Sequence, residues 1–564
     1  MFAVLILFFV SGASQAGEFT PARQDGVKDV YMVLLAEGVA RNPRNAQTAH
    51  LPSVAVVAEH VADLHGGQVT EFWEHALRGF VVEMPEARAR ALARHPWVAA
   101  VAQDYAISTP VGDCSDVGTT QLSNTRMLPT PFPTMAGQSL SCSDPDPQHD
   151  TMPGSPLCID NWGIDRIDQT SVSRNQNYFF TDNGRSTSNA NPPRAVHVYI
   201  MDTGILATHD EFKDANGVSR VLAGADATRN PVDDDSDGTP PNLSDCAGHG
   251  HGTHVAGIIG GRTYGVAKDV LLHAVKIACS SADSFATVSV RALNWIAANA
   301  IMPAVVNWSG ANRQDLAADP VLNSAVSGVL SLNIHVVQAA GNQSPSHNPG
   351  DPSLLRDACD WSFGGLTPSV IVAGGSDEND GRWTRREGDP FYTGYCVNQG
   401  DCGSNVGACV DIWAPAAHVI SASKRGNNRY CRLSGTSMAA PHVAGIVALY
   451  IEDIPWASLN EVDRALRSRG TWNACAATRT TRTGSAWART TCSSTLASTP
   501  SRRTRRRTLS TTSVASATPA TSAPVRAMTS ASSLTGGSGA TAPRPVSAGP
   551  SPIPSPLASA SGST

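Results

Sequence analysis

Several features are scarce or absent in this 564-residue sequence, and each absence excludes a class of protein. None of the 12 cysteines forms a CxxC pair, and their spacing matches no structural zinc site. Beyond residues 2–10, no apolar run approaches the length that crosses a bilayer, so a membrane-spanning protein is not expected. The formal net charge of −6 gives no sign of a nucleic-acid-binding protein.

Acidic residues are missing from the last part of the chain. From Thr471 to Thr564 there is no Asp or Glu, and every basic residue is an arginine among Thr, Ser, Ala and Pro. Such a composition cannot form a packed core, so residues 471–564 are predicted to be a low-complexity, disordered tail. Three explanations stay open: a Ser/Thr/Pro stalk, a basic interaction tail through Arg502–Arg507, and an out-of-frame translation of GC-rich DNA.

The N-terminus and the cysteines both indicate a secreted protein. Residues 2–10 form a short apolar run, and Ser14-Gln15-Ala16 then offers a signal-peptidase site, although no basic residues precede the run. Residues 1–16 are therefore predicted to be a signal peptide. Several cysteines lie in loops rich in Gly, Asn and Asp, so we interpret most of them as disulfides. Buried free thiols in a cytosolic protein are the alternative.

Hydrophobic patterns divide the rest of the chain into two α/β regions. In residues 29–108, strand patterns at 30–35, 79–84 and 98–101 alternate with helical patterns at 54–64 and 87–93. Residues 109–157 are rich in Pro, Ser, Thr, Asp and Gly, which is typical of a linker or surface insertion.

Residues 158–470 form the second, larger region. Buried-strand patterns alternate there with helical patterns; the strands are expected at 196–201, 271–275, 304–307, 335–338 and 370–373, and the helices at 252–259, 287–298 and 320–332. This alternation predicts an α/β fold with a mostly parallel sheet and helices on both faces. Active groups then belong at the carboxyl ends of the strands.

The stretch Gly435–Gly445 delivers a serine at the start of an apolar helical run. Backbone N–H groups in the first turn of a helix are unpaired, and the helix dipole favours negative charge beside them. The Ser437 hydroxyl could attack a carbonyl there, and its own N–H could help to hold the resulting oxyanion. Taken alone, Ser437 could equally be an ordinary helix N-cap.

Three further polar residues follow strands or begin a helix. Asp202 ends a strand and precedes Thr-Gly, where it could orient a base or simply form a turn. His251 lies between two glycines, and an imidazole exchanges protons near neutral pH. Asn342 follows another strand, where its amide could donate to an oxyanion or serve the turn. The spacing of His249, His251 and His254 does not match the HExxH zinc motif.

Taken together, these motifs resemble the subtilase family. The segments that carry the resemblance are Asp202-Thr203-Gly204, Gly250–Gly257, Ala339–Asn342 and Gly435–Gly445, in the order Asp…His…Ser. With the Trp162–Gln169 entry segment, the chain looks closest to the proteinase-K-like branch. The resemblance implies that Ser437 is the nucleophile, His251 the base and Asp202 its orienting acid, with Asn342 and the Ser437 N–H as oxyanion donors. No cofactor is implied for the chemistry.

The resemblance also implies how substrate and inhibitor bind. Residues 29–108 are similar to the inhibitory propeptides of subtilases, which assist folding and then place their C-terminal tail in the active site. Substrate would add as a β-strand along Ser309 and Gly310, with Ala339, Ala340 and Gly341 in the S1 wall. The family usually has Leu after the serine of this first segment, and this chain has Gly, so the preference at P4 stays open.

Structural calcium is a further implication of the resemblance. Relatives in the proteinase-K-like branch hold Ca²⁺ through two backbone carbonyls and an Asp, and the matching positions here are Pro368, Val370 and Asp411. The acidic loop Asp233–Asp237 could also hold Ca²⁺ or could simply be a solvated loop, since it lacks the full EF-hand spacing.

The expected function is that of a secreted, monomeric serine endopeptidase made as a self-cleaving zymogen. It would act on polypeptides and bind neither nucleic acid nor membrane. Two alternatives remain. The propeptide could stay bound after one cleavage, which would leave a binding protein. The chain could also be inactive, because the last strand segment of the family is not recognisable after Gly470.

Overall fold

The computed structural model of the chain describes residues 17–107, 162–168, 178, 184–186, 194–228, 242–246, 250–279, 285–310, 318–343, 356–365, 367–384 and 403–470. The expected signal peptide (1–16), linker (109–157) and tail (471–564) lie outside these residues. No helix of the described residues is both long enough and apolar enough to cross a membrane.

An N-terminal unit is built on a five-stranded sheet in the order β1-β5-β2-β4-β3. Its strands are β1 (Glu18–Thr20), β2 (Gly26–Leu35), β3 (Gln68–Trp73), β4 (Gly79–Glu83) and β5 (Val98–Tyr105). β1 is parallel to β5, and the other neighbours are antiparallel. Side chains alternate across each strand, so Tyr31 and Val33 face one core while Met32 faces another.

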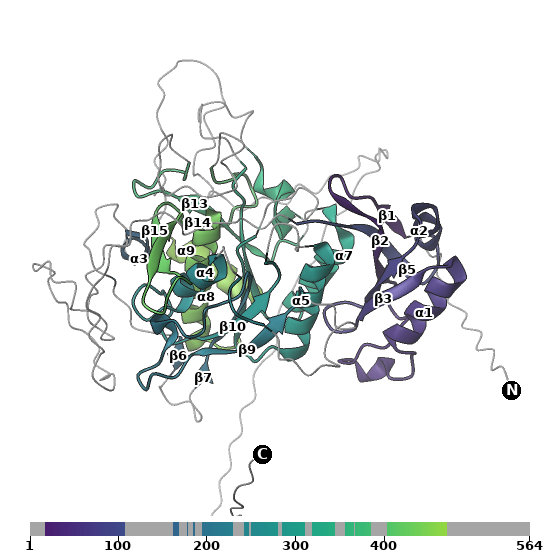
Figure 1. Cartoon of the computed structure of the whole chain (residues 1–564), viewed down its shortest axis with the longest axis horizontal. Helices are drawn as coiled ribbons and strands as arrows, with labels where there is room; N and C mark the ends of the chain where they lie inside the picture. Colours follow the sequence, from purple (N-terminus) through teal and green to yellow (C-terminus); the bar gives the residue numbers. More distant parts are fainter. Residues whose placement is uncertain are drawn as a thin grey trace, which may run out of the picture. The chain divides into compact units, whose positions relative to one another are not determined.

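Two helices, α1 (Val54–His65) and α2 (Glu86–Leu92), cover one face of this sheet (Figure 1). Apolar residues at helical spacing, including Val54, Val57, Ala58 and Val61, give α1 one buried face. The Ser53 side chain accepts from the Val56 N–H at its start, and Gly66 ends it in a left-handed conformation.

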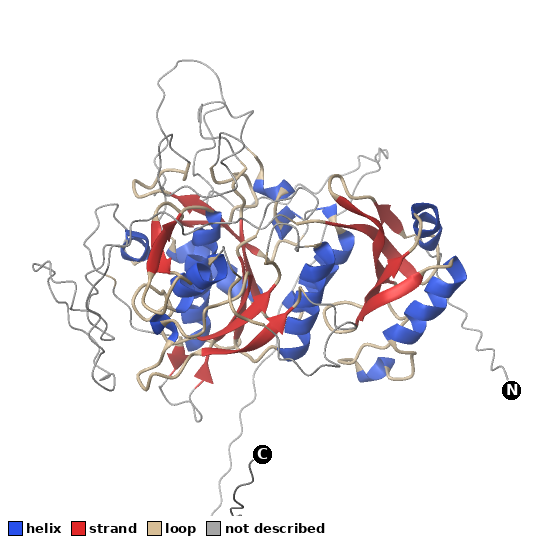
Figure 2. Ribbon diagram, viewed as in Figure 1, coloured by secondary structure: helices blue, strands red, loops and turns tan. Residues whose placement is uncertain are grey.

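The second region contains a seven-stranded sheet in which every neighbouring pair is parallel (Figure 2). In spatial order the strands are β14 (Ile412–Pro415), β13 (Ile371–Ser376), β12 (His335–Ala339), β11 (Ala304–Trp308), β8 (His197–Asp202), β10 (Leu271–Lys276) and β9 (Val221–Asp226). All residues of β8, β11 and β12 are buried, as expected for strands covered on both faces.

Helices cover both faces of this sheet and separate two cores (Figure 1). On one face lie α4 (His251–Gly260), α8 (Thr436–Asp453) and α9 (Leu459–Arg469), packed against Val198 and Ile200 of β8. On the other face lie α5 (Ala286–Asn299) and α7 (Pro320–Leu330), packed against Tyr199 and Met201. That second core also includes residues of the N-terminal sheet, so α5 and α7 lie between the two sheets.

Shorter elements complete the described residues. They are α3 (Trp162–Ile167), the paired strands β6 (Arg185–Ser186) and β7 (Arg194–Ala195), the paired strands β15 (Val419–Ala422) and β16 (Tyr430–Leu433), and 3-10 turns at Ala46–Thr48, Asp210–Phe212, Ala358–Asp360 and Phe363–Gly365.

The predicted α/β class with a mostly parallel, doubly covered sheet is confirmed. The five strands expected between residues 196 and 373 are β8, β10, β11, β12 and β13, and the three expected helices are α4, α5 and α7. β9 and β14 were not anticipated. β9 is an edge strand with no fully buried residue, and β14 has four residues and ends in Pro415, so neither shows a buried apolar run. In the N-terminal unit, β1 and β3 were also missed.

Candidate active site

The candidate residues gather at the carboxyl edge of the seven-stranded sheet. Asp202 is the last residue of β8, which lies between β10 and β11. The strands that follow β8 in the sequence lie on both sides of it, so β8 stands at a topological switch point. Ligands of parallel sheets bind at such a point. Ser309 follows β11, and Asn342 follows β12 a few residues further along the same edge.

Asp202 and His251 form a buried, hydrogen-bonded pair. Nδ1 of His251 lies 2.8 Å from Oδ1 and 3.0 Å from Oδ2 of Asp202, and both side chains are about 5% exposed or less. A carboxylate can only accept, so Nδ1 donates and Nε2 is left as the basic nitrogen. Burial lowers the pKa of His251, but the charge and hydrogen bond of Asp202, together with the charge of Asp245, raise it overall.

Ser437 is the second residue of α8. The N-cap of this helix is Gly435, which has no side chain to bond the first N–H groups. Ser437 Oγ donates to the carbonyl oxygen of Ser309 at 2.9 Å, so its single proton is directed there and not to His251. Pro441 has no N–H to bond the Ser437 carbonyl four residues earlier, and that carbonyl instead accepts from Ser309 Oγ at 2.9 Å.

Asn342 is held by its amide oxygen at the start of α8. Its Oδ1 accepts from the N–H of Thr436 at 2.9 Å and from the hydroxyl of Thr436 at 2.8 Å. Because an N–H must meet the carbonyl oxygen of the amide, these bonds identify Nδ2 as the atom that stays available as a donor. A Cβ at Gly435 would lie 3.4 Å from this Nδ2, and Gly435 has φ of +150°, so only glycine suits the position.

The predicted substrate-binding residues lie on two segments beside Ser437. Ser309 and Gly310 follow β11, Ala339 ends β12, and Ala340 and Gly341 follow it; all except Gly310 are buried. Some of their backbone groups are already bonded. Gln338 Nε2 donates to the Gly310 carbonyl at 3.1 Å, and the Gly341 N–H donates to Thr436 Oγ1 at 3.1 Å.

Comparison with known proteins identifies the family. The family model described as "Subtilase family" matches residues 194–485. An extracellular serine proteinase of Thermus sp. is 31% identical over 440 residues, covering 78% of this chain and 81% of the relative. The chain belongs to the subtilase family.

Two further matches are subtilisin-like or serine proteases. Alkaline serine exoprotease A of Vibrio alginolyticus is 36% identical over 309 residues, covering 55% of this chain and 46% of that relative. A solved structure of a cold adapted subtilisin-like serine proteinase is 33% identical, with a TM-score of 0.43, and covers 56% of this chain and 93% of that chain. By family, as the family model and the Thermus relative show, the chain is a subtilisin-like serine proteinase, and proteinases act on polypeptides.

In this subtilase, one of the three positions expected to hold calcium, Asp411, has other partners. Asp411 Oδ2 accepts from the Val372 N–H at 2.8 Å, and Asp411 Oδ1 pairs with the guanidinium of Arg467 on α9. Burial raises the pKa of this carboxyl to about 6, while the Val372 N–H and Arg467 act in the opposite direction. Since both carboxylate oxygens of Asp411 are bonded and one partner is already cationic, this side chain is not arranged to bind a metal here, and the ligand set Pro368, Val370 and Asp411 stays a prediction.

The other candidate metal groups offer no ligand set in the described residues. His254 Nε2 lies 3.1 Å from the Val419 carbonyl and 3.2 Å from the Cys431 carbonyl, which makes it a structural side chain of α4. His249 and the acidic loop Asp233–Asp237 lie outside the described residues. Among the residues that are described, no group of three His, Cys, Asp or Glu side chains could hold a metal.

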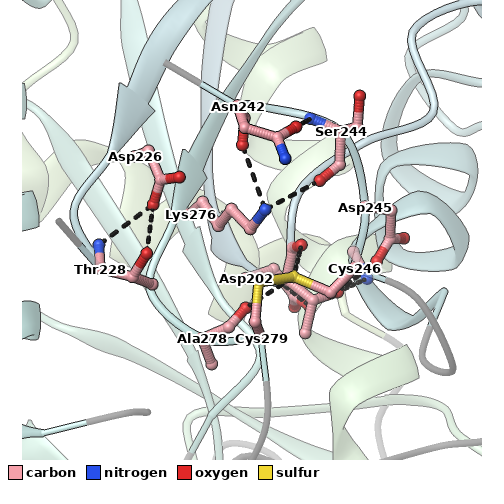
Figure 3. Close-up of a disulfide and its surroundings, with 12 residues drawn as sticks. Asp202, Asp226, Thr228, Asn242, Ser244, Asp245, Cys246, Lys276, Ala278 and Cys279 are labelled. Carbon is pink, nitrogen blue, oxygen red and sulfur yellow. Dashed lines mark hydrogen bonds between the residues drawn. A yellow bond between two sulfur atoms is a disulfide. The ribbon is translucent and has the colours of Figure 1, made fainter. Parts of the chain in front are cut away.

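Two disulfides are present in the described part of the chain, in keeping with the predicted use of the cysteines. Cys359 pairs with Cys409, and Cys246 pairs with Cys279. The second disulfide lies beside Asp202 and Asp245 at the carboxyl edge of the sheet (Figure 3). It joins the segment 242–246 to the end of β10.

Two side chains next to the Asp202–His251 pair were missed by sequence reasoning. Thr203 Oγ1 accepts from the Gly252 N–H at 2.9 Å and donates to Asp245 Oδ1 at 2.7 Å. Asp245 is half-buried, and its partial removal from water raises the pKa of its carboxyl. A single Asp six residues before His251 gives no signal in sequence, because only the fold shows which backbone groups it meets.

Proposed function

We propose that this chain is a secreted serine endopeptidase that hydrolyses peptide bonds through Asp202, His251 and Ser437. The main support for this proposal is the buried 2.8 Å contact between Asp202 and His251 Nδ1. It lies at the same sheet edge as the start of α8, which has no side-chain cap. Nucleophilic acyl transfer requires a nucleophilic hydroxyl, a general base and an acid that orients this base. Ser437, His251 and Asp202 would supply these three groups.

The first chemical step moves one proton and forms one bond. Ser437 Oγ attacks the scissile carbonyl while His251 Nε2 takes its proton, and His251 then protonates the leaving amine. Asp202 stabilises the charged imidazole, in agreement with the raised pKa of His251. The Ser437 hydroxyl now donates to Ser309, so it must rotate toward Nε2 before reaction; such bonds often tighten only with substrate bound.

The oxyanion would be held by two donors beside the nucleophile. Asn342 Nδ2 is one, since its Oδ1 is engaged by Thr436, and the Ser437 N–H in the first turn of α8 is the other. An extended substrate would lie along Ser309–Gly310 with its P1 side chain against Ala339–Gly341. Chemistry of this kind uses no cofactor.

The N-terminal unit would act as an inhibitory propeptide of a self-cleaving zymogen, and we place the chain in the proteinase-K-like branch. The support is a polar interface on α5. Asp104 accepts from the Thr287 N–H and hydroxyl at 3.1 and 2.8 Å, and Glu71 pairs with Arg291 at 2.6 Å. Asn294 Oδ1 accepts from the N–H of His75 at 2.7 Å. Cleavage in or just before residues 109–157 would free a monomeric enzyme.

Expression of the whole chain beside a Ser437→Ala variant tests the proposal. We expect the unsubstituted chain to lose its N-terminal unit and hydrolyse casein, and the variant to do neither. Self-cleavage without casein hydrolysis would instead support a binding protein that keeps its propeptide. Folded protein with neither activity would refute the enzyme, and failure to fold would favour the inactive product. Sequencing the transcript across codon 470 identifies an out-of-frame tail.

A further inference from the structure

The helix that carries His251 begins without a cap of its own. The N-cap of α4 is Gly250, which has no side chain, yet three N–H groups around His251 are bonded from elsewhere. Thr203 Oγ1 accepts from the Gly252 N–H at 2.9 Å. Asp245 accepts from the N–H of Gly250 at 3.3 Å and from that of Thr253 at 2.8 Å.

Hydrogen bonds connect Asp245 to the sequence neighbours of both Asp202 and His251. Its Oδ2 also accepts from Thr253 Oγ1 at 2.5 Å, two residues beyond His251. Its Oδ1 accepts from Thr203 Oγ1 at 2.7 Å, and the Thr203 N–H in turn donates to Asp202 Oδ1 at 2.8 Å. One carboxylate therefore links the turn after β8 to the first turn of α4.

The segment that carries Asp245 is itself fixed at several points (Figure 3). Lys276, which is buried at the end of β10, donates to the carbonyls of Asn242 and Ser244, each at 3.1 Å. The next residue, Cys246, forms the disulfide with Cys279. Its N–H also donates to the Thr203 carbonyl at 3.2 Å. Hydrogen bonds from a buried lysine and a disulfide thus hold Asp245 in place near Asp202.

We propose that Asp245 is a positioning residue of the proteolytic site, which fixes His251 against Asp202 and places a second negative charge beside the imidazole. The inference rests on the proposed function of His251 as the base. Among the described residues, three titratable groups act on His251: Asp202 from β8, Asp245 from the 242–246 segment and His254 from its own helix. Burial lowers the pKa of His254 to about 3, so it is neutral, and the two carboxylates raise the pKa of His251.

The test compares Asp245→Asn with Asp226→Asn in the self-processed enzyme. Asp226 is a matched control, because its Oδ1 also accepts from the N–H and hydroxyl of a threonine, Thr228, but it does not touch α4. We expect Asp245→Asn to lower kcat about 10–100-fold with KM unchanged, since small misplacements of catalytic groups have effects of that size. The acidic limb of its kcat profile should move to lower pH. Asp226→Asn should change neither. An acidic limb that stays in place would overturn the proposal.

A second measurement separates this inference from the proposed function. In a Ser437→Ala background, the titration of the His251 ring is followed by NMR with and without Asp245→Asn. A lower pKa of His251 in the double variant supports the proposal even if the unsubstituted chain proves inactive, and an equal pKa overturns it.

If Asp245→Asn does not fold, Thr203 provides the same test. Thr203→Val removes the hydroxyl that joins Asp245 to Gly252 and should lower kcat, whereas Thr203→Ser keeps the hydroxyl and should restore it. Equal kcat values for the two variants would overturn the proposal.

Discussion

The helices on the two faces of the seven-stranded sheet differ in how their N-termini are capped. On one face, α4 and α8 begin at Gly250 and Gly435, and the residues just inside them are His251 and Ser437. On the other face, α7 is capped by its own Asp319, whose carboxylate accepts from two N–H groups of its first turn.

Helix α5 shows what the difference means. Its N-cap is Phe285, whose side chain cannot accept a hydrogen bond, and the first turn is bonded instead by Asp104 of the N-terminal unit. The start of α5, which has no cap of its own, is therefore a position where another part of the chain docks. At α8 the ligand is the proposed oxyanion, and at α5 it is a carboxylate of the N-terminal unit.

The largest expected effect concerns the start of α8 and is tested at Asn342. Asn342→Ala removes one of the two proposed oxyanion donors, and we expect kcat to fall about 10²–10³-fold with little change in KM. Melting temperature serves as the control for folding, because Asn342 also accepts from Thr436. A variant with near-normal kcat would mean that the uncapped start of α8 does not bind the oxyanion through this side chain.

The docking side is tested at Gly328 of α7, which lies against the Ala76 carbonyl of the N-terminal unit. A Cβ on Gly328 would lie 1.7 Å from the Ala76 carbonyl oxygen. Overpacking costs about 1–3 kcal/mol, although alanine favours the helix. Gly328→Ala should therefore raise the dissociation constant of the N-terminal unit by roughly tenfold.

The rate at which casein hydrolysis appears after self-cleavage reports this effect. Activity should appear sooner in Gly328→Ala than in the unsubstituted chain. The exposed neighbour Ser327 supplies the control, because Ser327→Ala raises helix propensity on the same turn without filling that contact. Equal rates in all three proteins would argue against docking of the N-terminal unit on α7.

The same interface should depend on pH through two buried carboxyls. Burial raises the pKa of Asp104 to about 6, and that of Asp319 also to about 6, from an ordinary value of 3.8. A carboxyl with a raised pKa in the complex binds a proton on association. The complex is therefore most stable below about pH 4, loses stability as the pH rises toward 6, and changes little above that.

Gel filtration of a Ser437→Ala chain, nicked in the linker by an added protease, measures this dependence. We expect more separation of the two units at pH 7 than at pH 5, and a smaller difference when Asp104 is replaced by Asn. Separation that is independent of pH would show that these carboxyls do not change protonation on docking.

The smallest expected effect concerns α9, which forms its own cap through Ser458 and Glu461 and takes no part in either docking position. Arg467→Ala removes the partly exposed partner of Asp411, so we expect a loss of about 1 kcal/mol, or about 2–4 °C in melting temperature. A calcium chelator should affect the melting temperature of the unsubstituted chain and of Asp411→Asn equally, because the loop Asp233–Asp237 is a separate candidate for calcium. A decrease with chelator that Asp411→Asn abolishes would show that a metal, and not Arg467, holds this corner.

Sequence reasoning could single out residues that are marked by their local pattern, and their catalytic roles stay predictions. Asp202 after a buried strand, His251 between glycines and Ser437 at a helix start are all visible in this way, and the fold brings Asp202 and His251 into contact. Asp245 could not be found, because its partners Thr203 and Thr253 are recognised only when two loops meet. The pairing of Asp411, an expected calcium ligand, with Arg467 could not be predicted for the same reason, since the two residues lie 56 positions apart in the sequence.

What the sequence determined by itself is the fold class and the chemical type of the site. Buried strand runs and helical periods specify a parallel sheet covered on both faces, because side-chain burial repeats along the chain. Only the tertiary structure decided which groups bond one another at the edge of that sheet. Capping of α4 by Asp245, capping of α5 by Asp104 and occupation of Asp411 by Arg467 all depend on distances between segments, and local sequence patterns carry no information about those distances.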